Sequence, residues 1–94
     1  MTESEFEHYV RLYRRNVFAA ALCLLRNEYD ADDVTQEVFI RFYRYKGSFN
    51  DDEHIKAWLI RCAINCGKTM LGSRWRKLSL PLEAAEGLSH TDSY

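Results

Sequence analysis

The stretch Ile55-Lys-Ala-Trp-Leu-Ile-Arg-Cys-Ala-Ile-Asn-Cys-Gly-Lys-Thr-Met70 decides the fold. Its apolar residues recur at steps of three and four, the spacing of one face of an α-helix. That face comprises Ile55, Trp58, Leu59, Cys62, Ala63, Cys66 and Met70. The predicted helix runs from Asp52 or Glu53 to Lys77, because breakers are rare before the single proline, Pro81.

Two further helices are predicted upstream by the same spacing. The first runs from about Ser4 to Arg26, and the second from about Ala31 to Tyr45, with Asp30 as its N-cap. Residues 46–53 break the periodicity and are rich in turn formers, which predicts a loop. The fold class is therefore all-α: a compact bundle of three long helices over residues 1–78, with room for one extra short helix, and a largely flexible acidic linker or tail over residues 79–94.

Composition limits the classes of protein. With 94 residues and 47% hydrophobic content the chain forms one small domain. No apolar run approaches the roughly 18–20 residues of a membrane span, and no signal peptide is recognisable, which favours a cytoplasmic protein. We interpret Cys23, Cys62 and Cys66 as reduced thiols, and Cys62 and Cys66 as buried; a metal site from Cys62, Cys66 and His54 is the less favoured alternative. No cofactor is expected, and no nucleophile, phosphate loop or calcium loop suggests an enzyme.

The charges are sorted along the chain. Residues 54–78 carry six cations and no acid, the 53 residues before them carry eleven acids against seven bases, and the tail carries three acids. On the third helix, Arg61, Asn65, Lys68, Gly72 and Arg76 recur at steps of three and four on one polar side. Cations neutralise phosphates and Asn pairs with base edges, so this side predicts nucleic-acid binding, with an ordinary solvated face as the alternative.

The second helix has an acidic start and a mixed outward face. That face comprises Asp33, Gln36, Glu37, Ile40 and Arg44. Polar groups that fix orientation around one aliphatic residue suit a protein-docking surface. A solvated face is again the alternative.

Three blocks of sequence together resemble a known family. Asp30-Ala-Asp-Asp-Val-Thr-Gln-Glu-Val-Phe39, then Arg41-Phe-Tyr43, and then Ala57-Trp-Leu-Ile-Arg-Cys-Ala-Ile-Asn65 are similar to region 2 of bacterial RNA polymerase sigma factors of the extracytoplasmic-function (ECF) group. The resemblance covers about Phe6 to Lys77. It implies that the second helix docks on the clamp helices of the largest catalytic subunit of RNA polymerase, and that the third helix and its loop recognise and hold the melted promoter −10 element.

The resemblance also implies roles for individual residues. Together with the outward face, it gives a docking set of Asp33, Gln36, Glu37, Phe39, Ile40, Tyr43 and Arg44. It gives a pocket for an unstacked base from Ser48, Phe49, Asn50 and Asn65, and phosphate contacts from Arg61, Lys68, Arg74, Arg76 and Lys77, with Trp75 stacking on a base or covering the helix end. Phe49 is alternatively a loop anchor in the core, and Trp58 is better interpreted as core than as a wedge in melted DNA.

Departures from the family pattern qualify these expectations. Thr35 replaces the usual aliphatic residue and Tyr43 a frequent Trp, which predicts a more polar docking surface, and Gly67 and Gly72 weaken the basic helix. The tail resembles a linker cut before a second DNA-binding domain. The alternative function is an interaction module bound by an anti-sigma factor, without promoter reading; a duplex-reading helix-turn-helix protein is disfavoured because the basic helix is too long and too apolar.

Overall fold

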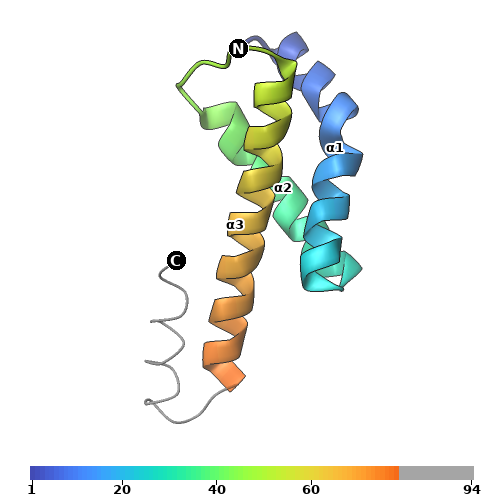
Figure 1. Cartoon of the computed structure of the whole chain (residues 1–94), viewed down its shortest axis with the longest axis vertical. Coiled ribbons are helices and arrows are strands. Elements are labelled where there is room, and N and C mark those ends of the chain that lie inside the picture. Colours follow the sequence, from blue (N-terminus) through green and yellow to red (C-terminus); the bar gives the residue numbers. More distant parts are fainter. Residues whose placement is uncertain (79–94) are drawn as a thin grey trace.

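The computed structural model describes the backbone of residues 1–78 and the side chains of residues 1–74. It contains three helices, α1 (Glu3–Leu25), α2 (Glu28–Arg44) and α3 (Asp52–Leu78), and no strand within residues 1–78. Figure 1 shows α3 running beside the other two helices and extending past the α1–α2 connection. The predicted all-α bundle of three long helices is confirmed. The predicted tail, 79–94, lies outside the described residues.

The first connection is shorter than predicted. Arg26 adopts a left-handed conformation (φ 55°), and its N–H donates to the Leu22 carbonyl, which ends α1. Asn27 is the N-cap of α2, since its side chain accepts a hydrogen bond from the Asp30 N–H at 3.0 Å. The prediction of Asp30 as N-cap is therefore wrong. Because one left-handed residue reverses the chain, α2 begins at Glu28, and Asp30 lies in its first turn.

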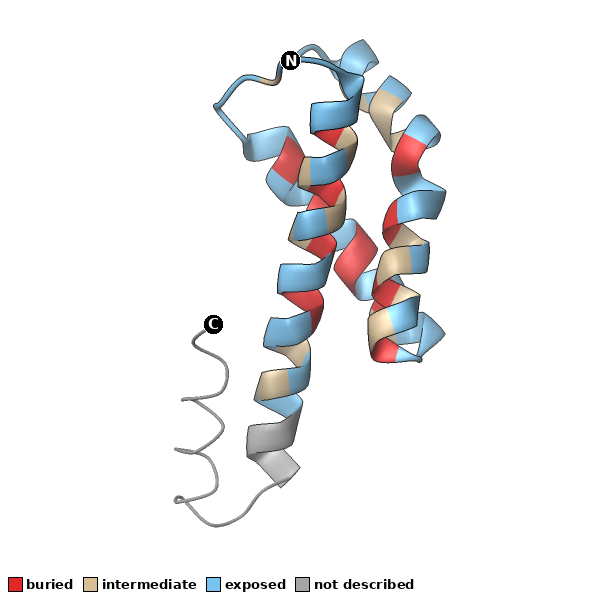
Figure 2. Ribbon diagram, in the orientation of Figure 1, coloured by how far each residue is buried: buried red, intermediate tan, exposed pale blue. Residues whose placement is uncertain are grey.

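The buried positions lie on all three helices (Figure 2), and their side chains form one hydrophobic core. At its aromatic end Phe42 is fully buried, and the rings of Phe6, Tyr9, Phe49 and Trp58 lie around it at centroid distances of 5.9–6.1 Å. The expectation that Trp58 packs on the core is confirmed. This cluster joins α1, α2, the loop and α3, so a single group of rings fixes their relative positions.

At the other end, α1 and α3 approach closely at Gly67. A Cβ added there would lie 2.6 Å from Cδ2 of Leu24. Gly67 weakens α3, but it lies where any larger side chain would clash with Leu24 of α1.

The α2 helix is buried over a wider arc than one stripe, because it packs against both α1 and α3. Its buried residues include Thr35, whose side chain is 3% exposed and whose hydroxyl donates to the Ala31 carbonyl at 2.7 Å. The expectation that Thr35 makes the docking surface more polar is therefore wrong. No helix of the described part is long and apolar enough to cross a membrane.

Candidate docking and nucleic-acid surfaces

The polar side of α3 faces away from the core. Arg61, Asn65 and Lys68 are all exposed. They line a shallow depression on α3 together with the apolar side chains of Ile60 and Ile64. We call these three residues the α3 edge. Two cations, an amide and neighbouring apolar surface can together contact phosphates, a base edge and a base face.

The loop before α3 is anchored by Phe49. The ring of this half-buried residue lies 5.2 Å from that of Tyr45 and 6.0 Å from that of Trp58, measured between centroids. The structure thus gives Phe49 the contacts of a loop anchor. The backbone N–H of Asn50 donates to Nδ1 of His54 at 3.0 Å, which holds the Ser48-Phe-Asn50 segment against the start of α3.

Trp58 links this loop to the α3 edge. Asn65 follows Trp58 by seven residues, so the two lie on nearly the same side of the helix, about 10 Å apart along its axis. Phe49 lines a depression with Phe42 and Tyr45, whereas Asn65 lies in the depression on α3. The shared pocket for an unstacked base stays a prediction.

The predicted docking residues lie on two sides of α2. Gln36, Ile40, Tyr43 and Arg44 are exposed and line a groove with residues of α1, namely Glu3, Phe6 and Glu7. We call this the α1–α2 groove. Ile40 is 46% exposed and Tyr43 is 60% exposed, so each offers apolar surface that a partner could bury. Phe39, predicted at the flank of the surface, is only 7% exposed and packs edge-on against Phe6, so it contributes just the floor of the groove.

Asp33 and Glu37 face the opposite way, toward α3. With Met70 and Arg74 they line a second groove, the α2–α3 groove. The Glu37 carboxylate already accepts a hydrogen bond from Nε of Arg41 at 2.8 Å, one turn later in the same helix. A partner that contacts both grooves must therefore straddle α2.

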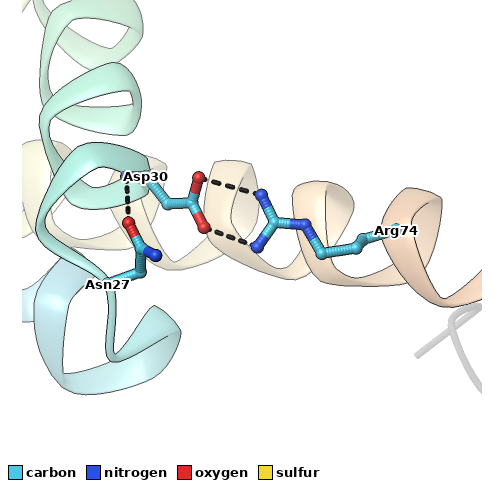
Figure 3. A network of polar contacts seen from close by, with 3 residues as sticks. All are labelled: Asn27, Asp30 and Arg74. Carbon is cyan, nitrogen blue, oxygen red and sulfur yellow. Dashed lines mark hydrogen bonds and ion pairs between the residues drawn. The ribbon is translucent and has the colours of Figure 1, made fainter.

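Arg74 faces α2 and not the α3 edge. It follows Arg61 by thirteen residues, which places it about 140° around the helix axis from that residue. Its guanidinium donates two hydrogen bonds to the Asp30 carboxylate, at 2.5 and 2.8 Å (Figure 3). These bonds hold the pKa of Asp30 below its usual value, and the same pair raises that of Arg74. The predicted contacts Trp75, Arg76 and Lys77 lie outside the described side chains.

Comparison with known proteins identifies the family. The model of the family described as Sigma-70 region 2 matches residues 9–77. The chain belongs to this family. It is similar to the RNA polymerase sigma-H factor of Pseudomonas aeruginosa, at 35% identity over 77% of this chain and 37% of that protein. It is also similar to the ECF RNA polymerase sigma factor SigW of Bacillus subtilis, at 32% identity over 67% of this chain and 34% of that protein.

A shorter match has higher identity. The ECF RNA polymerase sigma-E factor of Escherichia coli K12 is 42% identical over 51% of this chain and 25% of that protein. The region 2 domain thus spans about a third or less of the length of these relatives. No solved structure matches it. The resemblance to region 2 of ECF sigma factors, inferred from the sequence blocks, is confirmed.

The cysteines of this region 2 domain are free thiols in three environments. Cys23 is exposed, Cys62 is half-buried and Cys66 is buried. Burial, with the neighbouring Cys66 thiol as a second cause, raises the pKa of Cys62 to about 11. Within the part of the chain that is described, no group of three or more side chains is arranged to hold a metal ion.

Sequence reasoning missed two contacts in the region 2 domain. The pairing of Asp30 with Arg74 joins residues 44 positions apart, and no local pattern signals it. The imidazole of His54, weighed only as a metal ligand, instead accepts the loop hydrogen bond and packs on Phe49 at 5.1 Å between ring centroids. A His three residues after an Asn-Asp pair at a helix start is compatible with such a role, but this spacing does not specify the partner.

Proposed function

We propose that this region 2 domain acts in transcription initiation as a binding module without catalysis. It docks on the clamp helices of the largest RNA polymerase subunit through α2, and it recognises and holds melted promoter −10 DNA through α3 and the loop before it. The observation that carries the proposal is the exposed α3 edge, whose two cations and one amide lie on a different helix from the acidic docking residues. The names of the relatives, all RNA polymerase sigma factors, support the same reading.

Charge separation supports a division between the two surfaces. The α1–α2 groove has Glu3 and Glu7 on its α1 side, and carboxylates repel a phosphate backbone. The α3 edge carries Arg61 and Lys68, and its depression has one acid, Glu53, at the end nearest the loop. DNA is therefore favoured on α3, and a protein partner is favoured on α2.

The docking surface is tested by a pull-down with isolated polymerase clamp helices. Tyr43→Ala is expected to weaken retention, because Tyr43 is exposed in the α1–α2 groove. Tyr29→Ala is the matched control, since Tyr29 is a second exposed tyrosine of α2 and is not among the residues of that groove. Equal retention of both variants and the unaltered domain would exclude docking through this groove.

The DNA surface is tested with a single-stranded −10 oligonucleotide. Asn65→Ala is expected to cost about 1–3 kcal/mol of binding free energy and to reduce discrimination between bases. Arg61→Ala is expected to weaken binding to all sequences and to lower the slope of log affinity against log salt by about 0.7. Arg15→Ala, which removes an exposed cation of α1, is the control. Full affinity in both α3 variants would favour the alternative, an interaction module that does not read promoters.

A further inference from the structure

The ion pair between Asp30 and Arg74 connects the two functional helices. It joins the first turn of α2 to the last turns of α3, with both terminal nitrogens of the guanidinium on the two carboxylate oxygens (Figure 3). Two other ion pairs of the described residues, Glu7 with Arg11 and Glu37 with Arg41, each join residues one turn apart in one helix. Two-point pairing of this kind fixes the direction of a side chain as well as its position.

Asp30 is fixed in the first turn of α2 through its backbone, and its side chain is largely covered in the ion pair. The Asp30 N–H is bonded to the capping side chain of Asn27, and only 13% of the Asp30 side chain is exposed. The acid lies at the positive end of the α2 dipole, and the arginine lies near the negative end of the α3 dipole. Each charge is therefore stabilised by the dipole of its own helix, and the ion pair holds the two helix ends together.

The pair also lies at the far end of the α2–α3 groove. Val34, Cys66 and Met70 line the middle of this groove, and Arg74 lies beyond them on α3. The cationic run Arg74–Lys77 belongs to these last turns. Its direction relative to α2 therefore depends on what holds Arg74.

We infer that Asp30 is a positioning residue for the nucleic-acid surface: it fastens Arg74, orients the cationic end of α3 relative to α2, and withdraws Arg74 from the phosphate contacts. This revises the role predicted for Arg74, whose side of the helix is turned away from the α3 edge. The DNA-binding part of this inference rests on the proposed function. The fastening of α3 does not.

Whether Asp30→Asn strengthens or weakens DNA binding distinguishes this role from simple charge repulsion. Removing an acid from a DNA-binding protein ordinarily strengthens binding, because repulsion of the phosphates falls. If Asp30 positions α3, Asp30→Asn instead weakens binding of the 94-residue chain to a single-stranded −10 oligonucleotide, by about two- to fivefold at low salt, because fewer molecules hold α3 in the competent direction. Asp32→Asn is the matched control: it removes an exposed acid from the same turn, one that accepts a bond from Gln36 and not from Arg74.

A double-mutant cycle with Arg74→Gln completes the test. Arg74→Gln is expected to weaken DNA binding as much as Asp30→Asn, with no further loss when the two are combined. Arg61→Gln removes a cation from the α3 edge. Its loss of DNA-binding free energy is expected to add to that of Asp30→Asn and to that of Arg74→Gln. Stronger DNA binding by Asp30→Asn, or additive losses at Asp30 and Arg74, would overturn the inference.

Hydrogen exchange measures the fastening without DNA. Both Asp30→Asn and Arg74→Gln are expected to accelerate exchange of the amides from Met70 to Arg74, and to leave those of the Ile55–Ala63 segment unchanged. Unchanged exchange after Met70 in both variants would refute the fastening, whatever the DNA result. If exchange accelerates in both variants but the unaltered chain binds no −10 oligonucleotide at all, the proposed function is refuted. The Asp30–Arg74 ion pair then remains as a purely structural contact.

Discussion

Phe42→Ala is expected to remove a large part of the stability of this domain. Phe42 is fully buried, and five aromatic rings from α1, α2, the loop and α3 lie within 6.4 Å of its centroid. Truncating a buried Phe to Ala costs about 3–5 kcal/mol, because apolar contact is lost and a cavity remains. A domain of this size has a free energy of unfolding of about 4–12 kcal/mol. The variant should therefore retain at most about three quarters of its free energy of unfolding.

Urea denaturation followed by far-UV circular dichroism measures this loss. Phe42→Leu is the control for size, and it is expected to cost less than about 1.5 kcal/mol, since a branched aliphatic side chain still fills much of the site. Tyr43→Ala, at the next position but 60% exposed, is expected to cost at most about 1.5 kcal/mol, since it loses mainly the edge-on contact of its ring with Phe6. A loss below about 1.5 kcal/mol in Phe42→Ala, with an unchanged dependence on urea, would refute the central position assigned to this ring.

Three smaller predictions follow from single contacts. Thr35→Val should change the free energy of unfolding by less than about 1 kcal/mol, in the stabilising direction, since the hydroxyl bonds only to the Ala31 carbonyl of its own helix; urea titration checks this. In the native domain at pH 7, Cys23 should react with a maleimide first and Cys62 slowly, because Cys23 is exposed and burial raises the pKa of Cys62 to about 11; mass spectrometry of timed samples would show the opposite order if the environments are misassigned. Since its partner Arg74 lowers the pKa of Asp30 from 3.8, the stability gained from this pair should be present near neutral pH and be lost as the pH falls through the lowered value. The melting temperatures of wild type and Asp30→Asn should accordingly differ at pH 6 and converge in acid.

The helices were predictable because their signal is local. Apolar residues at steps of three and four, an acidic first turn and the scarcity of breakers placed α3 to within a residue of its observed ends, Asp52–Leu78. The start of α2 was harder to predict, because Asn27 and Asp30 are both good capping residues and the sequence does not say which one the chain reversal will use. The left-handed Arg26 decides this, and arginine is not a residue that signals such a conformation.

The candidate surfaces were predicted less completely, and α2 shows why. A helix wheel assigns one inward stripe, but α2 packs against both neighbours, so Thr35 and Phe39 are buried in addition to Val38 and Phe42. The positions at which α1 and α3 cross α2 decide which residues beside the apolar stripe are buried. The sequence of α2 alone does not contain these positions. The same limit applies to Arg74, whose partner lies 44 residues away.

The two surfaces are separable because the core lies between them. Tyr43 projects from α2 into the α1–α2 groove, whereas Asn65 is exposed on α3, and neither belongs to the buried cluster around Phe42. Tyr43→Ala should therefore reduce docking and leave DNA binding intact, Asn65→Ala should do the reverse, and Phe42→Ala should reduce both through loss of folded protein. Asp30 and Arg74 are the exception, since they join α2 to α3 directly. If docking and DNA binding influence each other, a substitution in this ion pair should change that influence more than a substitution at the centre of either surface does.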